Sequence, residues 1–156
     1  MSESRRLMGI DYGEARIGVA LSDPLGLFAR PYRVIVHTST QDDLALLRAI
    51  AEQEQVTRVV VGLPTDSQGR IGSQAQAVIR WARKLARAVR LPIVFWDESY
   101  SSADALTIRQ SSSKSKRNRS EPLDDIAAAA ILQEYLDAGG ADHEPGQPLE
   151  TFSDIP

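Results

Sequence analysis

The stretch LMGIDYGEARIGVALSD, residues 7–23, predicts the first two strands of a sheet and holds an acid near the end of the first strand. Residues 6–12 and 16–22 are mainly apolar, and the turn-forming residues 13–15 between them indicate a β-hairpin. Asp11 therefore lies in a strand that otherwise favours burial, where a carboxylate is unusual. Its side chain could accept backbone hydrogen bonds in the turn, or it could belong to a functional site.

Downstream of the hairpin, strand and helix patterns alternate, which is typical of an α/β fold with parallel strands. RVVVGLP and PIVFWDE are continuous apolar runs of the kind found in strands that are covered on both faces. The sequence thus predicts a mixed five-stranded sheet, three antiparallel strands followed by parallel ones, with helices on both faces. We expect strands at 6–12, 16–22, 31–37, 58–64 and 92–98, and helices that begin at Thr40 and that span 73–89, about 102–110 and about 123–138.

The composition is that of an ordinary globular domain, with 156 residues of which 42% are hydrophobic and 25% charged. The absence of cysteine excludes disulfides and thiolate chemistry, and two histidines are too few for a zinc site. No apolar run is long enough to cross a membrane, and the polar start of the chain predicts no secretion signal. We therefore expect a cytoplasmic protein with no membrane partner.

The formal net charge of −3 hides an uneven distribution of charge along the chain. Residues 134–156 contain six acids and no Lys or Arg, which leaves 18 basic against 15 acidic residues in the rest. The mildly basic part permits a polyanionic partner. Residues 139–156 are also rich in Gly and Pro, so we expect a domain at 1–138 followed by a flexible acidic tail at 139–156.

Acidic residues recur where the predicted strands end and where the last helix begins. Asp11 ends the first strand, Asp97 and Glu98 end the last one, and Asp124 and Asp125 open the final helix. Sites in open α/β sheets form outside the strand ends, and clustered carboxylates need a cation to offset their repulsion. Mg²⁺ and Mn²⁺ prefer oxygen ligands and can activate water in phosphodiester cleavage. Alternatively, each acid could be an ordinary strand-end residue or complement the helix N-terminus.

Four stretches of the chain resemble the signature motifs of the YqgF/RuvX family. They are GIDYGEARIGVALSD, VVVGLP, WDESYSSADA and LDDIAAAAILQEYL, in the family's order and at about its spacing, from about residue 7 to residue 137. The resemblance implies a ribonuclease H-like fold, which agrees with the predicted order of strands and helices. Members of this family are described as Holliday junction resolvases, and family members also act as nucleases that mature the ends of pre-16S ribosomal RNA.

The resemblance also implies which acids are catalytic. Asp11 matches the first catalytic acid, Glu98 the second, and Asp124 the acid that opens the final helix, and all three would bind Mg²⁺ or Mn²⁺. Asp97 is then a neighbour of the site. Helical spacing alone does not choose between Asp124 and Asp125, because each shares a stripe with small or apolar residues, so Asp125 stays the alternate.

Basic residues lie next to these acids. Arg16 follows the first turn, where it could contact a phosphate or form a salt bridge. A polar loop before the last helix, SSSKSKRNRSEP, is basic like its counterpart in the family but lacks the glycine often found there. It could contact the phosphate backbone of a nucleic acid, or it could be a solvated loop. Its candidate nucleic-acid-binding residues are Lys114, Lys116, Arg117 and Arg119.

The leading hypothesis is a metal-dependent nuclease that processes structured RNA, specifically precursor ribosomal RNA. Resolution of branched DNA is second, and it would favour a homodimer with two sites over a monomer. A nucleic-acid-binding module without catalysis is an alternative, although all three family acids are present. GIDYG also resembles the opening of sugar kinases and actin-like ATPases, but those proteins clamp a nucleotide between two such lobes, and 156 residues supply one.

Overall fold

The computed structural model, which describes residues 4–98 and 124–156, contains the predicted mixed sheet and adds a short strand to it. The strand order is β3-β2-β1-β4-β5-β6. β1, β4 and β5 are parallel, whereas β2, β3 and β6 run antiparallel to the strands that they join. The strands are β1 (Leu7–Tyr12), β2 (Arg16–Ser22), β3 (Ala29–Val36), β4 (Arg58–Leu63), β5 (Ile93–Asp97) and β6 (Gln147–Pro148).

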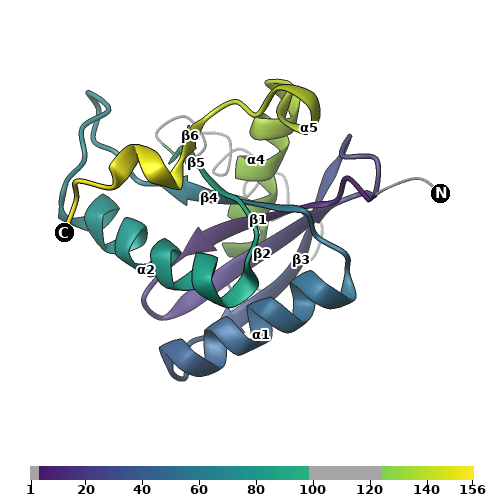
Figure 1. The fold of residues 1–156 in the computed structure, drawn as a ribbon, viewed down its shortest axis with the longest axis horizontal. Helices are drawn as coiled ribbons and strands as arrows, with labels where there is room; N and C mark the ends of the chain where they lie inside the picture. The colour runs from purple at the N-terminus through teal and green to yellow at the C-terminus, as the bar shows by residue number, and fades with distance from the viewer. Residues whose placement is uncertain (1–3, 99–123) are drawn as a thin grey trace, which may run out of the picture.

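Helices cover both faces of this sheet, as predicted (Figure 1). α1 (Thr40–Gln53) and α2 (Ser73–Val89) pack side by side on one face, and α4 (Asp124–Asp137) crosses the other. The predicted helix at about 102–110 and the basic loop after it lie outside the described residues. Within the part of the chain that the structure describes, no helix is long and apolar enough to cross a membrane.

The larger part of the core lies between the sheet and the pair α1 and α2. Alternate strand residues such as Ile10, Val61 and Phe95 point to this side and are at most 1% exposed. α2 contributes a stripe that includes Val78, Ala82 and Leu85, at the three- and four-residue spacing of a helix that buries one face. Burial of these side chains supplies the main driving force for folding.

The second, smaller cluster lies under α4, where helix and sheet approach closely. A Cβ atom at Gly9 of β1 would lie only 2.7 Å from Cβ of Leu132 and 2.9 Å from the carbonyl oxygen of Ala128. Glycine at position 9 therefore lets the backbone of α4 rest almost directly on β1. The buried members of this cluster are Leu7, Ala20, Val60, Val94, Ala128, Ile131, Leu132, Tyr135 and Leu136.

The C-terminal segment differs from the flexible tail expected for residues 139–156. After the short helix α5 (Gly140–His143), β6 pairs with β5, and the 3₁₀ helix η2 (Leu149–Phe152) follows. The Phe152 ring is 7% exposed and meets the Phe95 ring edge-on at 5.5 Å. Arg83 of α2 donates hydrogen bonds to the carbonyl oxygens of Phe152, at 2.7 Å, and of Ile155. Apolar residues at every third position, Leu149, Phe152 and Ile155, therefore anchor a segment whose average composition is polar.

Candidate active site

Asp11 and Glu98 lie on the face of the sheet that α4 covers, at the carboxyl ends of parallel strands. In β1, Ile10 points toward α1 and α2, so strand alternation places Asp11 on the opposite face with Gly9. Glu98 directly follows β5 and is half-buried. Both acids therefore belong to the same end and the same side of the sheet.

Gly62 of β4 makes room for the Glu98 side chain. A Cβ atom at position 62 would lie 3.2 Å from Cδ of Glu98 and 2.6 Å from Cδ1 of Ile131 in α4. Strand pairing sets Ile10 beside Val61, so the following residues, Asp11 and Gly62, occupy neighbouring positions. The missing side chain at Gly62 therefore lets Ile131 of α4 and the Glu98 side chain lie close to the backbone of β4.

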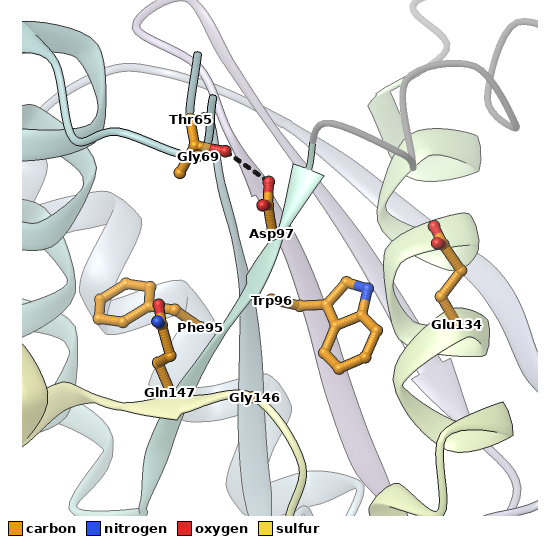
Figure 2. Close-up of a pocket in the computed structure, with 8 residues that line it drawn as sticks. All are labelled: Thr65, Gly69, Phe95, Trp96, Asp97, Glu134, Gly146 and Gln147. Atoms are coloured by element: carbon orange, nitrogen blue, oxygen red, sulfur yellow. Dashed lines mark hydrogen bonds between the residues drawn. The ribbon is translucent and has the colours of Figure 1, made fainter. Parts of the chain in front are cut away.

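Asp97 has different surroundings from those of Glu98. Thr65, in the loop after β4, donates a hydrogen bond of 2.5 Å to Oδ1 of Asp97 (Figure 2). Because successive side chains of β5 point to opposite faces of the sheet, Asp97 lies on the same face as Phe95. Trp96 and Glu98 lie on the face that α4 covers. Geometry thus separates the two adjacent acids, and it supports Glu98 as the residue that belongs with Asp11.

The third candidate, Asp124, is the first residue of α4, and only its backbone is described. Ala128, one turn later, reaches Gly9, which is two residues before Asp11. Tyr135, near the end of α4, bonds to Arg58 at the beginning of β4, so α4 runs opposite to β1 and its first turn is directed toward the end of β1 that carries Asp11. Asp125 is half-buried in the same turn. Asp124 and Asp125 both stay candidates for the third acid of the site.

The donor set suits a hard divalent cation. Carboxylate oxygens are the ligands that Mg²⁺ and Mn²⁺ prefer, and Asp11 and Glu98 both carry them. Among the residues that the structure describes, no three acidic or histidine side chains gather closely enough to hold a metal ion. The expected triad includes Asp124, whose side chain is outside that description.

Of the residues predicted to contact nucleic acid, Arg16 lies among the residues that the structure describes. Its side chain is exposed at the start of β2, and its carbonyl oxygen accepts a 2.9 Å hydrogen bond from the backbone N–H of Gly13. Arg16 is thus held at the turn that follows Asp11, on the rim of the candidate site. Lys114, Lys116, Arg117 and Arg119 lie outside the described residues.

Polar groups also meet on the other side of the same sheet edge, around the start of α1. Nδ1 of His37 lies 2.5 Å from Oδ2 of Asp43, whose side chain is 3% exposed. Tyr12, next to Asp11, stacks on Trp81 with ring centroids 4.3 Å apart. Burial, and then the charges of Glu14 and Asp43, raise the pKa of the Tyr12 phenol above its ordinary value. This group fixes the ends of β1 and β3 beneath the acids.

Three features near the site were not anticipated from the sequence. Gly9 and Gly62 let residues of α4 approach the strands closely, and the signal in the sequence was a glycine inside an otherwise apolar strand.

A cavity of about 290 Å³ also lies at the end of β5, against β6 (Figure 2). Trp96, Asp97, Glu134 and Gln147 contribute side chains to it, and Thr65, Gly69, Phe95 and Gly146 complete its lining.

Known proteins resemble this chain in sequence and in fold. Residues 5–138 match the family model RuvX, described as Holliday junction resolvase. A protein of Syntrophomonas wolfei named "Putative pre-16S rRNA nuclease" is 40% identical over 134 residues, which cover 86% of this chain and 95% of that protein. A protein of Moorella thermoacetica with the same name is 42% identical over 135 residues, covering 86% and 96% of the two chains.

Among solved structures, RuvC of T. thermophilus in complex with a Holliday junction substrate matches with a TM-score of 0.58. The match covers 92% of this chain and 98% of RuvC at 15% sequence identity. At that identity the similarity establishes the fold alone, which is the ribonuclease H-like α/β fold that the family resemblance implied.

Proposed function

Because this chain belongs to the RuvX family, we propose that it is a divalent-metal-dependent nuclease that hydrolyses phosphodiester bonds at the ends of pre-16S ribosomal RNA. The observation that carries the proposal is the position of Asp11 and Glu98 on one face and at one end of the sheet, beside the start of α4. The relatives named for pre-16S rRNA cover nearly the whole chain, and they support the choice of RNA as substrate. The activity would belong to the cytoplasm.

The roles of the residues follow from their positions. Asp11, Glu98 and Asp124 would hold Mg²⁺ or Mn²⁺, which when bound supplies activation of water and stabilisation of the leaving oxygen. The strand β1 positions Asp11, and the missing side chain at Gly62 makes room for Glu98. Arg16 on the rim would bind a backbone phosphate and orient the strand that is cut. The basic residues Lys114, Lys116, Arg117 and Arg119 would extend that contact.

Resolution of Holliday junctions is the second candidate function. The description of the RuvX family and the fold shared with RuvC favour it. This reaction needs two cuts on opposite strands, so it predicts a homodimer, whereas end processing of RNA is compatible with a monomer. A module that binds nucleic acid without cutting it is less well supported, because the acids that such a module would not need are retained.

The test is cleavage of a precursor 16S ribosomal RNA fragment and of a four-way DNA junction by the same preparation, with Mn²⁺, Mg²⁺ or EDTA. Asp11→Asn should reduce metal-dependent cleavage by at least about 100-fold, because it removes a ligand charge without changing the shape of the side chain. Asp42→Asn, an exposed acid in the first turn of α1, is the matched control and should cut normally.

The outcome separates the candidate functions. Preference for the RNA supports end processing, and preference for the junction supports resolution. Salt-sensitive binding by both proteins without any cutting would instead favour the binding module. Asp124→Asn and Asp125→Asn, compared in the same assay, identify the third acid as the position at which cleavage is lost.

A further inference from the structure

The cavity at the end of β5 has the composition of a site for a nucleobase. We propose that it binds one unpaired guanine of the strand that is cut, next to the cleaved phosphate, and so gives the enzyme a base preference. The inference rests on the proposed nuclease function for its biological meaning, but the binding of the base can be measured without cleavage. Figure 2 shows the side chains concerned.

The cavity has the size and the aromatic wall that a base requires. Its volume of about 290 Å³ lies at the lower end of the range for ligand sites, which suits a single base with part of its sugar. The Trp96 indole is half-buried and is held edge-to-face by the Tyr135 ring, with centroids 5.8 Å apart. An indole fixed in this way, with part of its surface exposed in a cavity, is a platform on which a base can stack.

A glycine keeps this wall open where β6 passes it. A Cβ atom at Gly146 would lie 2.6 Å from the carbonyl oxygen of Phe95 and 3.4 Å from Cε3 of Trp96. The backbone of the C-terminal segment can therefore pass close to β5 without a side chain that would cover the indole. The segment expected to be a flexible tail instead forms one side of the cavity.

The polar side chains that line the cavity favour a ligand that donates hydrogen bonds. Asp97 and Glu134 are carboxylates, which only accept hydrogen bonds when ionised and can accept several each. The hydrogen bond from Thr65 orients the Asp97 carboxylate, and the Gln147 amide adds a group that both donates and accepts. Figure 2 shows Trp96 between Asp97 and Glu134.

This chemistry distinguishes the bases from one another. Guanine presents two adjacent donors, N1–H and the N2 amino group, and a carboxylate can accept from both. Uracil presents carbonyl oxygens on either side of a single N–H, and these would face carboxylates without a hydrogen between them. Guanine is therefore the expected occupant, and uracil should bind most weakly.

The cavity adjoins the candidate active site. Trp96 pairs with Gly62 across β5 and β4, and Gly62 is the position that makes room for Glu98. Trp96 is also separated from Glu98 by Asp97 alone, and Asp97 lines the cavity. A phosphate that lies beside Glu98 and a base that stacks on Trp96 would thus belong to the same nucleotide or to adjacent nucleotides.

Tryptophan fluorescence tests the binding of the base directly. The chain has two tryptophans, and Trp81 is 5% exposed and stacked on Tyr12, so Trp81→Phe leaves Trp96 as the reporter. Guanosine 5′-monophosphate, titrated without divalent metal, should quench Trp96 fluorescence to saturation. Uridine 5′-monophosphate should need about 10-fold higher concentration, in line with the energy of one stacked and hydrogen-bonded base.

The control variants make the result specific to the cavity. Trp96→Phe, which leaves Trp81 as the reporter, should show no saturable quenching. Gln147→Ala should weaken guanosine monophosphate binding, whereas Gln74→Ala, an exposed glutamine of α2, should not. Equal quenching by the two nucleotides, or quenching that persists in Trp96→Phe, would overturn the proposal.

A cleavage experiment then links the base to the cut. RNAs that differ only in having G or U beside the cut site should be cleaved at rates that differ about 10-fold, and Trp96→Ala should remove that difference. If guanosine monophosphate binds but no substrate is cut, the nuclease function fails and the base site stands. If cutting is normal and neither the binding nor the selectivity depends on Trp96, the base site fails and the nuclease function stands.

Discussion

The two faces of the sheet differ in what their residues do, although the same strands supply both. Toward α1 and α2, the adjacent strands β1, β4 and β5 present a row of apolar side chains that are at most 1% exposed: Ile10, Val61 and Phe95. The next row, toward α4, consists of Asp11, Gly62 and Trp96. The first row belongs to the core, whereas the second combines an acid, a glycine and a half-buried aromatic.

The difference shows how a small domain accommodates a candidate site whose residues lower its folding stability. Carboxylates at a strand end and glycines within strands both reduce stability. Here the candidate acids Asp11 and Glu98 and the glycines at positions 9 and 62 lie on the side that α4 covers, while the larger apolar cluster lies on the opposite side. Successive strand residues point to opposite faces. One residue of a strand can therefore pack in the apolar core while the next contributes to the candidate site.

The sharpest test of this comparison replaces two consecutive aromatic residues. Phe95→Ala should lower the free energy of unfolding by about 3–5 kcal/mol, because it empties a fully packed position against Phe152. Trp96→Ala removes a larger side chain but should cost only about 1–2 kcal/mol, since its indole is partly exposed. Urea denaturation of both variants measures the difference. A larger loss for Trp96→Ala would mean that the α4 face is part of the main core.

Gly9 tests how closely α4 depends on the sheet beneath it. Gly9→Ala should lower the free energy of unfolding by about 1–3 kcal/mol, because the new methyl group meets the Leu132 Cβ and the Ala128 carbonyl, which cannot move without moving the helix. Gly72→Ala, where a Cβ atom would meet nothing within 4 Å, is the control and should change stability by about 1 kcal/mol or less. Equal losses in thermal denaturation would contradict the close approach of α4.

Much of the fold was accessible from the sequence because its patterns are strong and local. The strand Arg16–Ser22 and the helix Ser73–Val89 have the bounds that were predicted, since a turn or a glycine marks where each begins. The order of these elements predicted the mixed sheet with helices on both faces, and the resemblance of the four motifs implied the ribonuclease H-like fold. The sixth strand was missed because two residues, Gln147–Pro148, carry no periodic signal and depend on the exposed edge of β5.

The candidate site was predictable only in part. The sequence indicates which acids end strands, but the face that each one occupies depends on register, which separates Asp97 from Glu98. The roles of Asp11, Glu98 and Asp124 remain predictions from the family resemblance. The anchoring of the C-terminal segment was missed because its composition is acidic and rich in glycine, whereas its position depends on a few residues such as Phe152.

Gly62 separates the packing function of the α4 face from its chemical function. Gly62→Ala would push against the end of the flexible Ile131 side chain and against the Glu98 carboxyl group. We expect the free energy of unfolding to change by about 1 kcal/mol and metal-dependent cleavage to fall by about 10-fold, as for the loss of a group that orients a ligand. Calorimetric titration with Mn²⁺ should show weaker binding. Unchanged Mn²⁺ affinity would argue against Glu98 as a ligand.

The smallest expected effect concerns Tyr135 of α4, which is fully buried against the sheet. Arg58 donates a 3.0 Å hydrogen bond to its hydroxyl oxygen. Burial raises the pKa of the Tyr135 phenol, while the nearby Arg58 partly opposes that shift. The folded protein therefore keeps the phenolic proton at pH values where the unfolded chain loses it. This contribution to stability is complete below about pH 10 and is lost as the pH rises through the raised pKa.

Tyr135→Phe should thus have two effects of opposite sense. Near neutral pH it should lower the free energy of unfolding by about 1 kcal/mol, because the Arg58 donor loses a partner. Above about pH 10 it should make stability fall less steeply than in the parent protein, since one ionisation is removed. Tyr12→Phe, on the opposite face, should also flatten the alkaline limb, because burial and nearby acids raise the pKa of Tyr12 too. Urea titrations between neutral and alkaline pH measure both slopes, and an unchanged slope in Tyr135→Phe would mean that Tyr135 ionises equally in the folded and unfolded states.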